Sequence, residues 1–150
     1  MIASQPMYAR PGNRAAHDAL WALITDGLRD RGVAAPAMLD HDILPMDGWA
    51  RDDLVLGQMC NLPYRARFKD HVTLIGASDY GLPGCPPGHY RSVFITRSDR
   101  PETAPVALAN TRCVCNEVLS QSGYGAPQLW AQARGFTFKL HGVTGSHFER

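Results

Sequence analysis

Thr111-Arg-Cys-Val-Cys115 and Phe136-Thr-Phe-Lys-Leu140 are short segments whose composition predicts two β-strands. Between them, residues 124–133 predict a helix, and the turn Ser120-Gln-Ser-Gly123 comes just before it. A strand, a helix and a second strand in this order form the unit from which parallel sheets are built. This part of the chain therefore predicts an α/β fold.

The N-terminal half of the sequence continues the alternation. Residues 13–31 predict the clearest helix, because Ala16, Leu20 and Leu28, with Leu23 or Ile24, fall on one face. Strands are expected at residues 2–8, 38–43, 54–59, 71–76 and 90–96, and a short helix at 62–68. The fold expected from this pattern is mainly parallel sheets flanked by helices, in which ligands bind at the carboxyl ends of strands.

Composition excludes several classes of protein. The chain has 150 residues, 45% of them hydrophobic, and a formal net charge of +1. This is too apolar for an intrinsically disordered chain, and too nearly neutral for a protein that holds nucleic acid by a basic surface. No apolar run reaches the roughly 20 residues that span a bilayer. Residues 1–6 have neither the basic nor the apolar segment of a signal peptide, so none is expected.

The four cysteines are Cys60, Cys85, Cys113 and Cys115. Their spacing matches no zinc framework, so no metal site is expected. In a strand, residues 113 and 115 point to the same face, where they are either small core residues or two soft ligands. Cys60 and Cys85 would pair only in an oxidising compartment, and we expect free thiols.

Ser120-Gln121-Ser122-Gly123-Tyr124 carries the strongest indication of a binding site. It follows a strand and opens a helix, where backbone N–H groups lack partners and the helix dipole favours an anion. Two hydroxyl groups add donors there, and a glycine lets a ligand approach closely. The alternative is that Ser120 or Ser122 is an ordinary N-cap.

Two further places could contribute to such a site. A second turn with Gly and Ser, Thr144-Gly-Ser146-His147, follows the last predicted strand, and His147 could donate to an anion. Tyr8 and Tyr124 lie beside strand ends, and a tyrosine offers both an aromatic face and a hydroxyl group.

The chain resembles the PhnD-like substrate-binding proteins, the phosphate- and phosphonate-type solute receptors of ABC importers. The resemblance lies in residues 1–8, 61–64, 79–93, 119–124 with Pro127, and 144–147. It implies the class II periplasmic-binding-protein fold, with a first lobe at residues 1–96, a crossover or hinge at 97–105 and part of a second lobe at 106–150. It also implies binding without catalysis or cofactor, and a periplasmic location in the family.

In the site that the resemblance implies, Ser120, Gln121 and Ser122 hold the phosphoryl oxygens of a small oxyanion, with His147 at the second turn and Tyr8 on the opposite lobe. Gln121 stands where phosphonate receptors often carry Thr, and Asn61 where relatives carry Gly. Family members also continue beyond the point where this chain stops, which predicts a truncated product or an assembly of copies that covers the unfinished lobe. An ABC permease is the expected partner.

Two alternatives stay open at this point. One is an enzyme of the same fold that acts on a small heterocycle or vitamin precursor, with Cys60 or Cys85 as nucleophile. The other is a truncated remnant that binds no ligand.

Overall fold

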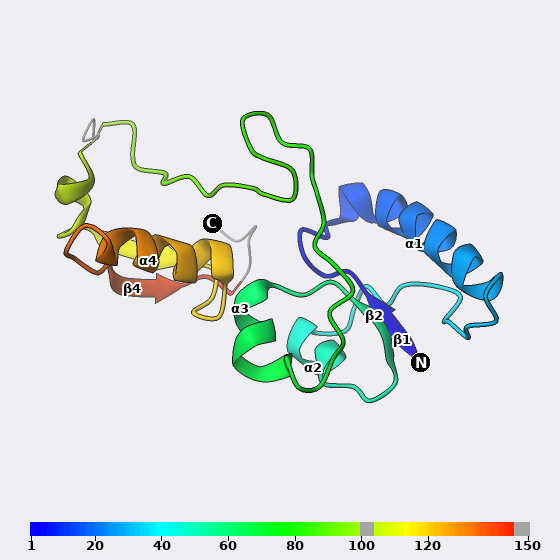
Figure 1. Ribbon diagram of the computed structural model, residues 1–150. Helices are drawn as coiled ribbons and strands as arrows, with labels where there is room; N and C mark the ends of the chain where they lie inside the picture. Colours follow the sequence, from blue (N-terminus) through cyan, green and yellow to red (C-terminus); the bar gives the residue numbers. More distant parts are fainter. Residues whose placement is uncertain (100–103, 146–150) are drawn as a thin grey trace. The chain divides into compact units, whose positions relative to one another are not determined.

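The computed structural model describes residues 1–99 and 104–145 (Figure 1). They form helices and short parallel strands, which confirms the α/β class. The chain folds into two compact units, which we call the N-terminal unit (Met1–Cys60 and Tyr64–Val72) and the C-terminal unit (Asn61–Pro63 and the described residues from Thr73 onward). The lobe boundaries expected at residues 96 and 106 stay a prediction.

The N-terminal unit is built on two parallel strands, β1 (Ile2–Ser4) and β2 (Leu54–Gly57). A short helix, α2 (Pro45–Trp49), packs against both of them. Sequence reasoning missed this helix, although a proline at its first position is a typical start signal. The segment between α1 (Arg14–Arg29) and α2 passes beside β1, where the Asp40 amide donates to the Ala3 carbonyl oxygen at 2.8 Å.

Helix α1 confirms the helix predicted at residues 13–31. It ends at Arg29, and in the turn that follows Gly32 adopts a φ of +70°, a conformation that glycine takes without strain. The buried face differs from the prediction, because Leu20 is exposed and Trp21 is buried instead. The Trp21 indole N–H donates to the Pro36 carbonyl oxygen at 3.2 Å, which turns this face toward the core of Ala3, Trp21 and Leu39.

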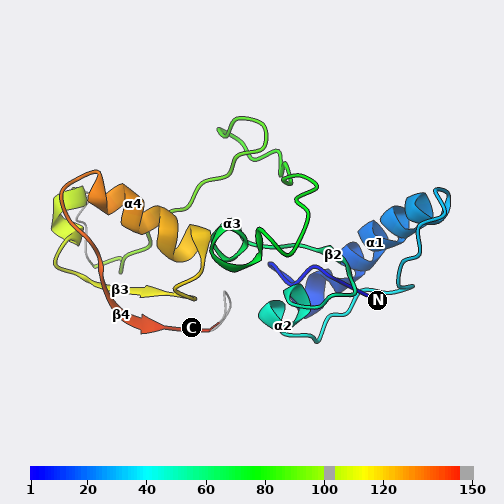
Figure 2. The ribbon, with the colours of Figure 1, turned by 60° about the horizontal axis from the view of Figure 1, so that its bottom comes forward.

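The C-terminal unit has two parallel strands, β3 (Arg112–Cys115) and β4 (Lys139–Val143). Between them in sequence lie a π-helical turn, η4 (Gln121–Gly125), and helix α4 (Ala126–Gln132). In both views α4 runs beside the strand pair (Figures 1 and 2). This strand–helix–strand order with parallel pairing confirms the unit predicted from residues 111–140.

Strand β4 begins later than the predicted strand at residues 136–140. The Gln128 side chain explains the shift, because it forms hydrogen bonds with both backbone polar groups of Phe138. Its Nε2 donates to the Phe138 carbonyl oxygen at 2.9 Å, and its Oε1 accepts from the Phe138 amide at 3.1 Å. A residue whose backbone groups are bonded to a side chain cannot also join a strand ladder.

Three predicted strands are wrong. Residues 38–43 form a turn, because the Asp40 carboxylate accepts from the Asp42 and Ile43 amides, both at 2.9 Å. Residues 71–76 and 90–96 form no strand in the described chain, and Ile75 and Ile95 are 80% and 90% exposed. Their β-branched and aromatic composition favours strands, but a strand also needs a neighbour to pair with.

The remaining elements are short. A 3₁₀ turn, η1 (Pro11–Asn13), precedes α1, and another, η3 (Pro105–Leu108), precedes β3. Helix α3 (Asn61–Pro63) and the π-helical turn η2 (Tyr64–Phe68) confirm the short helix predicted at residues 62–68. Within the described ranges, no helix has the length and apolar character that crossing a membrane requires.

Candidate ligand-binding pocket

The turn between β3 and α4 is organised by Ser120. This buried residue has extended backbone dihedral angles, and its Oγ accepts from the Gly123 amide at 3.0 Å. Its carbonyl oxygen accepts from the amides of Tyr124 (3.0 Å) and Gly125 (2.9 Å). Ser120 therefore caps the helical segment, the second of the two roles that its position suggested.

Gly123 is required by its neighbours in this turn. A Cβ atom built at Gly123 would collide with the Asn116 Oδ1 atom and would lie 3.1 Å from the Ser120 Oγ atom. The Asn116 side chain therefore fills the space that the missing Cβ atom of Gly123 leaves free. Any larger residue at position 123 must displace Asn116 or disturb the cap.

A cavity of about 330 Å³ lies beside this turn within the C-terminal unit. The residues that line it come from the exposed segment before η3 and from η4 and α4; they are Tyr90, Ser92, Phe94, Gln121, Ser122, Ala126, Pro127 and Trp130. The Ser92 Oγ donates to the Ser122 carbonyl oxygen at 3.0 Å, which attaches the exposed segment to the turn. We call this cavity the serine-turn pocket.

One wall of the serine-turn pocket belongs to an aromatic cluster of Phe94, Trp130, Phe136 and Phe138. The Phe94 ring centroid lies 4.8 Å from that of Trp130 and 5.4 Å from that of Phe138. Phe136 meets Phe138 edge to face at 5.4 Å, and the Arg134 guanidinium carbon lies 4.2 Å from the Trp130 ring centroid. These separations are those of favourable aromatic and cation–π contacts, so the wall is a packed surface.

The serine-turn pocket is electrically neutral. Its described lining contains hydroxyl groups, one amide and apolar surface, but no Lys, Arg, Asp, Glu or His side chain. A ligand in it would lie against Ser122 and Gln121 with no charged side chain in the described lining. Neutral dipoles of this kind can hold an anion without needing an opposite charge.

The residues predicted for the site fall in three places. Gln121 and Ser122 line the serine-turn pocket, Ser120 and Gly123 form the turn beside it, and half-buried Tyr124 follows in η4. Tyr8 lies in the N-terminal unit with a φ of +63°, and its carbonyl oxygen accepts from the Asn13 Nδ2 at 3.1 Å. Ser146 and His147 lie outside the described residues.

Sequence reasoning missed the aromatic wall. Phe94 belongs to a segment predicted as a strand, and Trp130 to a predicted helix, so nothing local indicated that they meet. The spacing of Phe136 and Phe138 was the available signal, because alternate residues of an extended segment share a face.

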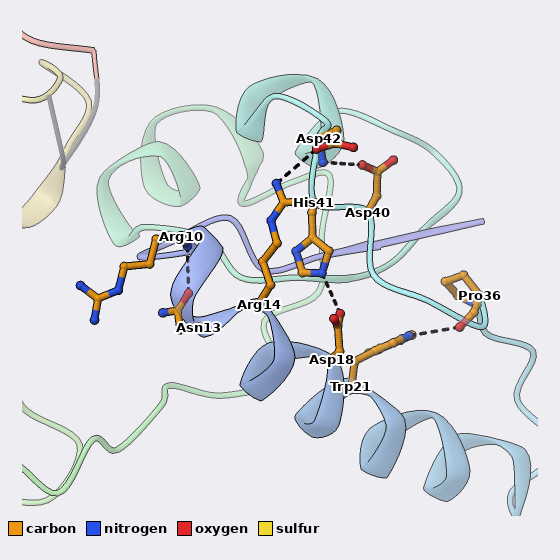
Figure 3. Close-up of polar contacts among 9 residues, drawn as sticks. All are labelled: Arg10, Asn13, Arg14, Asp18, Trp21, Pro36, Asp40, His41 and Asp42. Atoms are coloured by element: carbon orange, nitrogen blue, oxygen red, sulfur yellow. Dashed lines mark hydrogen bonds and ion pairs between the residues drawn. The ribbon is translucent and has the colours of Figure 1, made fainter.

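A polar cluster in the N-terminal unit joins residues 36–42 to α1 (Figure 3). The His41 Nε2 lies 2.7 Å from the Asp18 Oδ1, and the Arg14 Nη2 donates to the Asp42 Oδ1 at 3.4 Å. The amides of Asp42 and Ile43 hold the pKa of the Asp40 carboxyl below its ordinary value. These contacts hold the irregular segment against the helix, which is a structural role.

The cysteines do not form a site within the described chain. Burial raises the pKa of the Cys113 thiol, and it is also the largest cause of the raised pKa of the Cys115 thiol. A thiol with a raised pKa is less often ionised, so both are weak nucleophiles. Cys60 is buried in the N-terminal unit and Cys85 lies in the C-terminal unit, with no disulfide between them. The described residues contain no group of His, Cys, Asp and Glu side chains that could hold a metal ion.

Similarity to known proteins adds nothing to this geometry. Comparisons with protein-family models, with curated proteins and with solved structures find no match to the chain. A function for the serine-turn pocket must therefore be inferred from its own residues.

Proposed function

We propose that this chain is a solute-binding protein for a small oxyanion of the phosphate or phosphonate kind. The observation that carries the proposal is the serine-turn pocket, because the turn predicted to bind an anion contributes Gln121 and Ser122 to a cavity of about 330 Å³. This volume is at the lower end of the range for pockets that bind small molecules.

The chemistry of the lining favours an oxyanion held by neutral donors. A hydroxyl group and a carboxamide each supply donor hydrogens, and the lining includes one residue of each kind, Ser122 and Gln121. Among the described residues that line the pocket there is no carboxylate that would repel an anion. Selectivity for an anion would then depend on hydrogen-bond geometry.

The same lining favours binding over catalysis. A serine hydroxyl becomes an effective nucleophile only when a general base lies beside it, and in most enzymes that base is an imidazole, a carboxylate or an amine. None of these groups lines the described pocket. The class II periplasmic-binding-protein fold, the ABC permease as partner, and ligand contacts by Tyr8, Ser146 and His147 are further parts of the proposal.

Isothermal titration calorimetry of the full chain tests this function. Phosphate, phosphite, methylphosphonate and sulfate are titrated separately, and at least one of them is expected to bind. Ser122→Ala should weaken that binding by about 1–3 kcal/mol, since it removes a donor and leaves an anion oxygen unsatisfied. Ser78→Ala is the matched control, because Ser78 is exposed and does not line the pocket.

The proposal fails if none of the four anions binds to a chain whose circular dichroism and cooperative unfolding show that it is folded. The serine-turn pocket fails as the binding site if Ser122→Ala and Ser78→Ala bind the preferred anion equally well. The second outcome would place the anion at a different site.

A further inference from the structure

The lining of the serine-turn pocket has more apolar surface than an inorganic oxyanion can use. Besides Ser92, Gln121 and Ser122, the pocket is bounded by Tyr90, Phe94, Ala126, Pro127 and Trp130. A phosphate or sulfate ion has no carbon surface to place against such a wall. Filling the cavity with the ion and water would leave the aromatic side chains in contact with solvent, which gains nothing from the hydrophobic effect.

Phe94 shows that this aromatic surface is open. Its ring packs against Trp130 and Phe138, yet the residue is 45% exposed. One part of Phe94 is therefore committed to the cluster, while another part borders the pocket. An exposed ring that is held in place by packing is ready to receive a second flat group.

The wall is also preorganised. The two hydrogen bonds between Gln128 and the Phe138 backbone fix Phe138, and Phe138 in turn contacts Phe94 and Trp130. The Arg134 Nη1 donates to the Trp130 carbonyl oxygen at 3.1 Å, and its guanidinium lies over the Trp130 ring. Little side-chain entropy would be lost when a ligand binds to rings already held in place.

We propose that the natural ligand is an organic oxyanion with a single flat aromatic or heteroaromatic ring. This inference rests on the proposed function and specifies its substrate class. The ring packs against Phe94 and Trp130, and the oxyanion lies toward Ser122 and Gln121. The cavity volume of about 330 Å³ has room for a ring with its anionic substituent.

The test compares three probes on the full chain by calorimetry: phenylphosphonate, methylphosphonate and benzyl alcohol. The first has a ring and an oxyanion, the second only the oxyanion, and the third only the ring. Phenylphosphonate is expected to bind about tenfold or more tightly than methylphosphonate, because only its ring buries apolar surface against the wall. Benzyl alcohol is expected to bind more weakly than phenylphosphonate.

Each outcome separates the two proposals. Equal affinity for phenylphosphonate and methylphosphonate would overturn the ring but leave oxyanion binding intact. Equal affinity for benzyl alcohol and phenylphosphonate would support the ring but contradict the oxyanion. Failure of all three probes to bind a folded chain would overturn both.

A pair of variants locates the ring. Phe94→Leu is expected to lower the affinity for phenylphosphonate several-fold and to leave that for methylphosphonate within about twofold, because it removes an aromatic face and no polar group. Ile95→Val is the control, since Ile95 is 90% exposed and does not line the pocket. Thermal unfolding checks that both variants fold, and an equal loss of affinity for the two phosphonates in Phe94→Leu would contradict the placement.

Discussion

Gly123→Ala tests the geometry of the serine turn on which the binding proposal depends. The added methyl group would collide with the Asn116 Oδ1 atom and lie 3.1 Å from the Ser120 Oγ atom. The second contact involves the oxygen that accepts from the Gly123 amide, so a shift of Ser120 would also weaken the cap. The substitution should therefore destabilise the C-terminal unit.

The magnitude follows from two opposing effects. Inserting a methyl group into a filled site costs about 1–3 kcal/mol. Replacing glycine by alanine in a helical conformation stabilises the folded state by about 0.5–1 kcal/mol, because the unfolded chain then has less conformational entropy to lose on folding. The net expectation is a loss of about 1 kcal/mol. In an Asn116→Ala background the colliding oxygen is absent, and the same substitution should cost much less.

Urea unfolding followed by tryptophan fluorescence measures this effect. Trp130 reports on the C-terminal unit, while Trp21 and Trp49 report on the N-terminal unit. If unfolding has two steps, a variant without Trp130 or a variant without Trp21 and Trp49 shows which unit unfolds in each step. Gly27→Ala is the control: it lies within α1, and its Cβ would meet only the Arg31 Nη1, at 3.7 Å. That variant should gain about 0.5–1 kcal/mol.

Two results would refute the reasoning. One is that Gly123→Ala is as stable as the unmodified chain. The other is that it loses the same free energy with and without the Asn116 side chain, which would mean that Asn116 does not occupy the space beside Gly123.

Three further predictions concern other contacts. Gln128→Ala should cost the C-terminal unit about 1–3 kcal/mol in urea unfolding, because two hydrogen bonds to the Phe138 backbone are lost; the exposed Gln132→Ala is the control, and an equal effect of the two would contradict this. Thr25→Val should stabilise the N-terminal unit by about 1 kcal/mol, since the buried Thr25 Oγ1 has no hydrogen-bond partner among the described residues; a destabilised variant would count against it. Asp40 has a folded pKa below the ordinary value of 3.8, so its stabilisation is present above that pH and is lost as the pH falls through the folded pKa; Asp40→Asn should therefore lose less stability on acidification, and parallel stability–pH curves would refute this.

Local signals were sufficient for the elements whose partners are close in sequence. Helix α1 was predicted by its apolar spacing, and the parallel pair β3–β4 by the helix between the strands. Where a side chain bonds to the backbone, propensity failed, because Gln128 delays the start of β4 and Asp40 replaces a strand with a turn.

Contacts between distant residues could not be predicted in this way. Residues 71–76 and 90–96 have the composition of strands, but no described strand pairs with them. The turn at Ser120–Gly123 was found from its residues alone, whereas the pocket beside it depends on Phe94 meeting Trp130 across 36 positions of the sequence. Only the three-dimensional structure brings those two aromatic residues to the same wall.

A nuclear magnetic resonance titration of the ¹⁵N-labelled chain with methylphosphonate tests the proposed binding site most directly. The proposal predicts saturable shifts that are concentrated in the amides of residues 120–125, in Ser92 and in the Trp130 indole N–H. Residues 14–29 of α1, in the other unit, serve as the internal reference. Absence of saturable shifts, or shifts centred outside the residues that line the serine-turn pocket, would contradict oxyanion binding at this site.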